Sequence, residues 1–166
     1  MHSERFHEEV VPLQNSLCRF AKGLLHDPYE AEDVVQEILA KLWSRKDSLD
    51  TIDNVKALAF KMTRNLCLDK IKLRKREISE LEKSFLTVSD FNPHEQAEMK
   101  DMSTVIQNII RLLPEQQRLV IQLRSVEELS FEEIEKITDM SINSIRVTLS
   151  RARKAVNEIY QQHFNS

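Results

Sequence analysis

The chain has 166 residues, enough for one domain or two small ones, and 41% of them are hydrophobic, enough for globular cores. One glycine and four prolines provide few turn signals, and no stretch alternates apolar and polar residues as a strand would, so we expect an all-α protein. The formal net charge of -3 does not by itself indicate a nucleic-acid-binding protein, but acidic and basic residues are segregated along the chain.

Several classes of site and location are disfavoured. Cys18 and Cys67 lie far apart in apolar helical contexts without metal-ligand spacing, so we expect core thiols in a reducing compartment. The five histidines are scattered and form no ligand or triad spacing, so we expect no catalytic residue, no metal and no cofactor. No apolar run is long enough to span a membrane, and the N-terminus lacks a signal peptide, which favours a cytoplasmic protein.

Two helices are predicted before residue 44. An apolar stripe from Phe6 to Leu25 indicates the first, bent near Pro12. Asp27 as cap, Pro28 in the first position and Glu30 closing a capping box predict the start of the second, which ends near Trp43. The outer face of this second helix carries Glu30, Asp33, Gln36 and Glu37. The helix dipole accounts for an acid in the first turn, but two of these acids lie beyond it.

A polar loop is predicted over residues 44–53, followed by a third helix that starts near Asn54. The later half of this helix is basic, with Lys61, Arg64, Lys70, Lys72, Arg74, Lys75 and Arg76 against a single acid, Asp69. A basic run is often only a solvated face. Here the excess is too one-sided for salt bridges along the helix and indicates a phosphate-binding surface.

The polar composition of residues 78–100, with Asn92-Pro93 in the middle, predicts an interdomain linker. We therefore expect an N-terminal domain over residues 1–77 and a C-terminal domain over residues 101–166. Helical periodicity returns at Met102, and Pro114 is expected to open a further helix.

Residues 130–154, SFEEIEKITDMSINSIRVTLSRARK, have the pattern of a helix-turn-helix. Ser130 and Glu133 form a capping box, a break follows at residues 138–140, and Ser141 caps a second helix. That helix has one apolar stripe and an opposite face of Asn143, Ser144, Val147, Ser150, Arg151 and Lys154, with Arg146 and Arg153 on its flanks. An ordinary helical hairpin is the alternative interpretation. The absence of any acid between Ser141 and Val156 favours contact with phosphates.

Three stretches resemble RNA polymerase sigma factors of the sigma-70 family, extracytoplasmic-function (ECF) group. Residues 21–43, AKGLLHDPYEAEDVVQEILAKLW, are similar to the second helical region of that group. Residues 54–76, NVKALAFKMTRNLCLDKIKLRKR, resemble the adjoining segment that melts and reads the −10 promoter element. Residues 113–160 resemble the fourth region, which reads the −35 element. The motifs AEDVVQE, RNLCLD, LPEQQR and SRARK occur in the family's order.

The chain departs from the family pattern at four positions, one of which is Leu58, in place of an aromatic residue common near there. Glu128 and Asp139 stand where glycine is common, and Asp139 can still adopt a left-handed turn conformation. Glu135 replaces a usual alanine on the first helix of the motif. Two roles for Glu135 stay open, a salt bridge within the domain or repulsion of phosphate.

The resemblance implies a role for each surface. Asp33, Gln36 and Glu37 would dock on the clamp helices of RNA polymerase, and the loop over residues 45–53 would form a pocket for a base flipped from the non-template strand. Asn65 and Asp69 would lie beside that loop, while Lys61, Arg64, Lys70 and Lys72 hold phosphates. In the C-terminal domain Asn143, Ser144 and Val147 would reach base edges, Arg146 base or phosphate, and Ser150, Arg151 and Lys154 the DNA backbone.

The implied partners are core RNA polymerase, promoter DNA and an anti-sigma factor at the inner membrane of a bacterium, with no small-molecule substrate. Three hypotheses follow, and the leading one is a promoter-specificity subunit. A free-standing DNA-binding regulator that dimerises through its N-terminal half is the second, and a helical module that binds only protein is the third. Association with core polymerase distinguishes the first from the other two.

Overall fold

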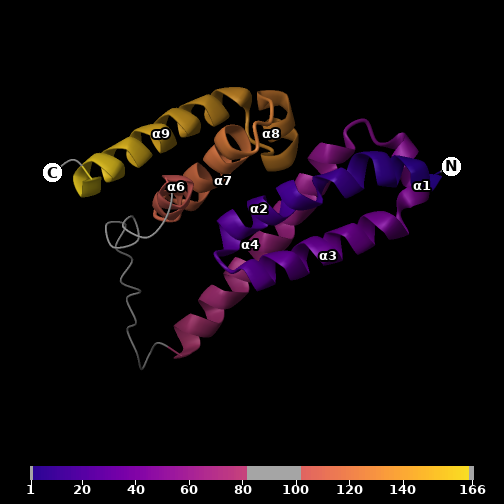
Figure 1. The fold of residues 1–166 in the computed structure, drawn as a ribbon, viewed down its shortest axis with the longest axis horizontal. Helices are drawn as coiled ribbons and strands as arrows, with labels where there is room; N and C mark the ends of the chain where they lie inside the picture. The colour runs from indigo at the N-terminus through magenta and orange to yellow at the C-terminus, as the bar shows by residue number, and fades with distance from the viewer. Residues whose placement is uncertain (1, 82–101, 165–166) are drawn as a thin grey trace.

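The computed structural model describes residues 2–81 and 102–164, and every regular element within them is helical, as expected (Figure 1). In the N-terminal half α2 (Gln14–Leu25), α3 (Pro28–Ser44) and α4 (Val55–Leu81) pack against one another. The C-terminal half contains α6 (Met102–Ile110), α7 (Glu115–Ile121), α8 (Phe131–Thr138) and α9 (Ile142–Phe164). The α7 helix continues directly into a π-helical turn, η4 (Gln122–Val126).

The first predicted helix is interrupted rather than simply bent. It consists of α1 (His2–Arg5), a π-helical turn η1 (Phe6–Val10), a 3-10 turn η2 (Val11–Leu13) and α2. Pro12 explains the break, because proline has no N–H to donate and its ring collides with the carbonyl four residues earlier. The apolar stripe nevertheless lies in the core, since Phe6 and Val10 are both buried.

The turn between α2 and α3 is held by local contacts. His26 ends α2 in the left-handed region at φ 60, and its N–H donates to Lys22 O. The Asp27 carboxylate accepts hydrogen bonds from the N–H groups of Tyr29 and Glu30, so the predicted cap of α3 is confirmed. Glu30 does not complete the predicted capping box, because its carboxylate pairs with Arg74 on α4.

The predicted loop between α3 and α4 contains a 3-10 helix, η3 (Lys46–Thr51), with Leu49 fully buried beneath it. The hydroxyls of Ser48 and Thr51 donate to carbonyls three residues earlier, which stabilises this tight turn. Asn54 Oδ1 accepts from Ala57 N–H at 2.8 Å, so α4 begins where the sequence predicts. The α4 helix continues to Leu81, past the predicted domain end at residue 77, and residues 82–100 of the predicted linker lie outside the described residues.

The helix-turn-helix forms as predicted. Ser130 Oγ accepts from Glu133 N–H, and the Glu133 carboxylate accepts from Ser130 N–H, which completes the capping box of α8. Asp139 ends α8 in the left-handed region at φ 62. Ser141 Oγ accepts from Ser144 N–H at 3.1 Å and caps α9. Ile145, Leu149 and Ala152 of α9 are buried, so its apolar stripe faces the core.

Candidate nucleic-acid and protein interfaces

The predicted reading face of α9 is exposed to solvent. Its exposed side chains are Asn143, Ser144, Arg146, Val147, Ser150, Arg151, Arg153 and Lys154. Val147 is 49% exposed although it is apolar, which suits contact with a base edge better than packing. The first acid of α9 is Glu158, so every charged side chain of this surface, from Arg146 to Lys154, is positive. The arrangement can enter a major groove and contact phosphates on both sides.

Arg146 differs from its neighbours because its guanidinium lies over an aromatic ring. The guanidinium carbon is 5.3 Å from the centre of the Phe131 ring at the start of α8, and that of Arg124 is 4.5 Å from the same ring. Cation–π contact orients Arg146 along the flank of α9. This contact joins the two helices of the motif at the surface that would face DNA.

The acidic patch on α3 comprises Asp33, Gln36 and Glu37, all exposed, on the side opposite the buried Val34, Val35 and Ile38. Steps of three and four residues place the three polar groups together on one face of the helix. Glu37 forms an exposed ion pair with Lys41 at 3.4 Å. Exposed pairs contribute little stability, so the carboxylate is available to another cation.

The basic surface of α4 is divided between free and engaged side chains. Among the predicted phosphate-binding residues, Lys72 is exposed and Arg64 and Lys70 are half-buried. Arg64 Nη1 donates to Asn65 Oδ1 at 2.8 Å, while Asn65 and Asp69 are exposed. Lys61 borders a groove at the end of the predicted base pocket, and Asn65 and Asp69 lie one and two turns further along α4.

Arg74 has a structural role that its place in the basic run does not indicate. Its guanidinium pairs with Glu30 of α3 and donates to Leu25 O at 3.1 Å. Arg74 thereby ties the last part of α4 to the turn between α2 and α3. Its guanidinium is therefore engaged within the protein and is not free to contact phosphate.

The two halves of the chain meet along a domain seam, defined as the contact of α2 and α4 with α6, η4 and α8. Glu127 is almost fully buried there and accepts two hydrogen bonds from Arg19, at 2.7 and 2.8 Å. On the α4 side, Lys61 Nζ lies 3.4 Å from Asp139 Oδ1. A predicted phosphate-binding residue of α4 is therefore in contact with the turn of the helix-turn-helix in this structure.

The single glycine of the chain lies at the domain seam. A Cβ placed on Gly23 of α2 would lie 1.6 Å from Nε2 and 2.7 Å from Cδ of Gln122 on η4. Gln122 is fully buried, and neither of its amide atoms has a hydrogen-bond partner. The close approach of α2 to η4 thus depends on the missing side chain of Gly23.

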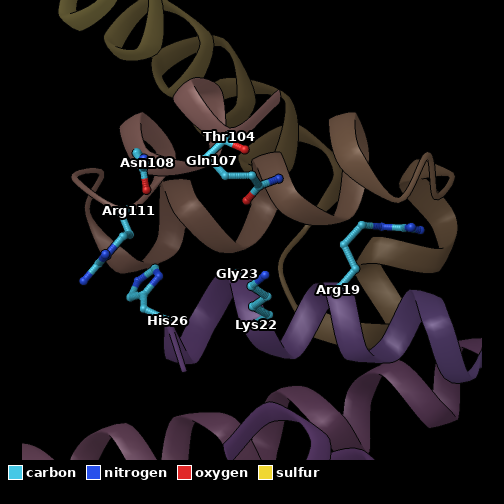
Figure 2. Close-up of a pocket in the computed structure, with 8 residues that line it drawn as sticks. All are labelled: Arg19, Lys22, Gly23, His26, Thr104, Gln107, Asn108 and Arg111. Carbon is cyan, nitrogen blue, oxygen red and sulfur yellow. The ribbon is translucent and has the colours of Figure 1, made fainter. Parts of the chain in front are cut away.

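A cavity of about 350 Å³ opens beside this contact, between α2 and α6. Figure 2 shows the residues that line it, with Arg19, Lys22 and His26 on the α2 side and Thr104, Gln107, Asn108 and Arg111 opposite. His26 and Arg111 point toward each other at one end. Burial, followed by the positive charges of Arg111, Arg118 and Arg74, lowers the pKa of His26 from 6.5 to about 4. His26 is therefore neutral at pH 7 within a positively charged seam.

Titratable groups elsewhere support structural roles. Burial raises the pKa of Cys67 to about 12 and also raises that of Cys18, so neither thiol is activated as a nucleophile. Burial alone would raise the pKa of Glu133, but hydrogen bonds from Ser130 and the charge of Lys56 reverse the shift and lower it. Within the described residues, no group of three or more His, Cys, Asp or Glu is placed to hold a metal ion.

Two sequence models of known families match this chain, one in its N-terminal half and one in its C-terminal half. The model described as Sigma-70 region 2 matches residues 10–77, and the one described as Sigma-70, region 4 matches residues 103–156. The ECF RNA polymerase sigma factor SigW of Bacillus subtilis is 26% identical over 165 residues, covering 93% of this chain and 88% of the relative. SigM of the same organism is 27% identical over 154 residues, covering 91% and 92%.

The chain belongs to the ECF group of the sigma-70 family. A solved structure of the sigma factor RpoE with the anti-sigma factor NepR from Bartonella quintana matches this sigma factor with a TM-score of 0.78. The two are 27% identical, and the match covers 95% of this chain and 98% of that one. CnrH, solved with the cytosolic domain of CnrY, has a TM-score of 0.70 at 18% identity, a likeness of fold. Membership of this family favours the promoter-specificity hypothesis over a free-standing regulator.

Three features of the sigma factor were not apparent from its sequence. Gly23 and Gln122 meet at the domain seam, Arg19 and Glu127 pair across it, and Arg5 binds the loop between α3 and α4. The sequence contained one signal for the role of Gly23. This residue is the only glycine of the chain and lies inside a predicted helix, where glycine is unfavourable. An isolated glycine in a helix often has a packing role, and this one does.

Proposed function

We propose that this sigma factor binds core RNA polymerase and directs promoter-specific initiation by reading the −10 and −35 elements. The observation that carries the proposal is the joint occurrence of regions 2 and 4 in one chain, with one acidic and two basic surfaces on them. As a member of this family the chain is regulatory, and we infer that it supplies no catalytic group to RNA synthesis.

The acidic patch on α3 is the proposed polymerase-docking site. Asp33, Gln36 and Glu37 are exposed on a helix whose other face lies in the core, so they can bind a partner without rearrangement of the domain. Two carboxylates on one helix face favour a basic partner surface and accelerate encounter through long-range attraction.

The loop over residues 45–53 and the exposed side of α4 form the proposed −10 interface. Extruding one base costs about a few kcal/mol in lost stacking, so contacts of the protein with the extruded base and strand must offset that cost. We assign the base pocket to the loop, and Asn65 and Asp69 of α4 to contacts with neighbouring bases. Phosphates of the same strand are assigned to Lys61, Arg64, Lys70 and Lys72.

The exposed face of α9 is the proposed −35 interface. We assign base contacts to Asn143, Ser144 and Val147, because they occupy the N-terminal part of the recognition helix. Ser150, Arg151 and Lys154 are assigned to the backbone, which fixes register without reading sequence. Arg146, oriented by Phe131, can contact either a base or a phosphate.

Promoter binding requires the domain seam to open. The two elements are named for positions about 25 base pairs apart, which is roughly 85 Å of B-DNA at 3.4 Å per base pair. In the closed arrangement Lys61 of the proposed −10 interface lies 3.4 Å from Asp139 of the −35 domain. The domains cannot occupy both elements in this arrangement, so we propose that polymerase binds and stabilises an open one.

We further propose that an anti-sigma factor controls this opening. The sigma factor RpoE from Bartonella quintana, which has this fold and is 27% identical, was solved with the anti-sigma factor NepR. None of the helices in residues 2–81 and 102–164 has the length and apolarity to cross a bilayer. We propose that the sigma factor acts in the bacterial cytoplasm, where core RNA polymerase and promoter DNA are located, and that an anti-sigma factor supplies any attachment to the inner membrane.

Run-off transcription tests the proposed function. Genomic fragments of the source organism are transcribed by core polymerase with and without the sigma factor. We expect discrete transcripts only when it is present, and their start sites define the promoters. Sequence-specific DNA binding without core polymerase and without added transcripts would instead support a free-standing regulator. Binding to protein alone would support the interaction module.

A further inference from the structure

The segment before residue 10 packs against the loop that joins α3 to α4. The α1 helix lies against η3, and η1 lies against α3 and α4. Figure 1 shows α1 beside this loop, at one end of the N-terminal half. The family model for region 2 begins at residue 10, so these contacts come from a segment outside the match.

Arg5, the last residue of α1, binds the second half of the loop through its guanidinium. Nη2 donates to Ile52 O at 2.6 Å, Nη1 donates to Leu49 O, and Nε donates to Glu9. Leu49 O and Ile52 O lie at the end of the 3-10 helix, and Leu49 O also accepts from Ile52 N–H at 3.0 Å. A planar guanidinium can donate to two acceptors at once, so Arg5 fixes their separation as well as their position.

The first half of the loop is held by aromatic contacts from the same segment. The Trp43 ring packs edge-on against Phe6, with centroids 5.1 Å apart, and against His7 at 5.9 Å. The Lys46 ammonium lies 4.1 Å from the centre of the Trp43 ring. The N-terminal segment therefore holds both ends of the turn that contains η3.

The side chains of the loop divide into two groups. Leu49 is fully buried, and the hydroxyls of Ser48 and Thr51 are bonded to loop carbonyls. Asp47 and Asp50 are exposed. Within the loop, the hydrogen bond from Ile52 N–H to Leu49 O closes the last turn. The contact from Arg5 supplements that bond with two more.

We propose that Arg5 is a positioning residue for promoter recognition, which holds the loop over residues 45–53 in the shape that receives the extruded −10 base. The inference rests on the proposed function of that loop. A pocket that must be ordered only after the base arrives binds more weakly and discriminates less than one formed beforehand. The N-terminal segment thus sets base selectivity without contacting DNA.

Two substitutions separate positioning from general stability. Arg5→Ala removes the guanidinium, and Arg5→Lys keeps the charge but replaces the planar fork by a single ammonium. Glu9→Gln is the matched control, because it removes the charged partner of Arg5 and leaves the bonds to both carbonyls. Helical content and melting temperature are measured for each variant, so that Arg5→Lys decides the question if Arg5→Ala is destabilised.

The assay uses a promoter fragment recovered by run-off transcription, together with derivatives in which each −10 base is replaced in turn. Permanganate reactivity of unpaired thymines reports strand opening by the complete holoenzyme. A mismatched base is ordinarily disfavoured by roughly 5- to 150-fold. We expect discrimination against the wrong base to fall about tenfold at one −10 position in the Arg5 variants, which corresponds to about 1.4 kcal/mol. We expect the Glu9 variant to keep the wild-type discrimination.

Affinities for core polymerase and for a −35 duplex are measured alongside and are expected to stay unchanged. Wild-type selectivity at every −10 base in the Arg5 variants would overturn the positioning role while leaving the sigma assignment intact. An equal loss at all bases, in proportion to a lower melting temperature, would also overturn it in favour of a purely structural role. Failure of the unsubstituted sigma factor to open any promoter would refute the proposed function and this inference together.

Discussion

Replacing Gly23 by alanine should open the domain seam without damaging either domain. The new Cβ would lie 1.6 Å from Gln122 Nε2, far inside van der Waals contact. The amide is the flexible end of its side chain, but Gln122 is fully buried and has little room to withdraw. Overpacking of this kind ordinarily costs about 1–3 kcal/mol. Because the cost arises only in the closed arrangement, the ratio of open to closed molecules should rise roughly 5- to 150-fold.

The same substitution should stabilise the N-terminal domain. Alanine is favoured over glycine inside a helix by about 0.5–1 kcal/mol. This gain acts on α2 in both arrangements and cancels from the opening equilibrium. We therefore expect a higher melting temperature for residues of the N-terminal domain together with a more open molecule, a combination that general destabilisation does not produce.

Energy transfer between dyes on the two domains measures the opening. One dye is placed at Lys72 on α4 and the other at Glu158 on α9, both exposed, with Cys18 and Cys67 replaced by serine and alanine. Combining Gly23→Ala with Gln122→Ala supplies the internal control, since the second change removes the collision and should restore high transfer. Unchanged transfer in Gly23→Ala, or no restoration in the double variant, would refute the role of this contact.

Three further predictions concern the acidic patch on α3, the recognition helix α9 and the histidine at the domain seam. Asp33→Arg combined with Glu37→Arg should abolish association with core polymerase in a pull-down while circular dichroism stays near wild type; retained binding would remove the docking assignment. Arg151→Ala should weaken binding to all −35 sequences alike and reduce the salt slope by about one. Asn143→Ala should instead relax choice at one or two bases by roughly 1–3 kcal/mol, so uniform loss in both variants would show that the recognition helix is oriented differently. Because the pKa of His26 falls from 6.5 to about 4 on burial among arginines, the separated state binds more protons between these values, and closure should weaken as pH falls from 6.5 toward 4. Energy transfer measured against pH should lose this dependence in His26→Gln.

The sequence by itself determined the features that depend on neighbouring residues. The caps at Asp27, Ser130 and Ser141 each join groups two or three residues apart, and all three formed as predicted. The apolar stripe of α9 also follows from local spacing, because 3.6-residue periodicity places its members on one face. The cap positions and the apolar stripes were together enough to predict an all-α fold, its helix-turn-helix and the exposed surfaces of α3 and α9.

Only the tertiary structure decided which polar groups meet across long separations. Arg19 and Glu127 are 108 residues apart, and Arg5 and Ile52 are 47 apart. Any of the 24 basic side chains could in principle pair with any of the 27 acidic ones, and local spacing does not rank these choices. Packing decides among them, because it fixes which helix faces approach and how closely. Packing thus pairs Arg74 with Glu30, which leaves it unavailable to phosphate. Gly23 matters only because η4 packs closely against α2.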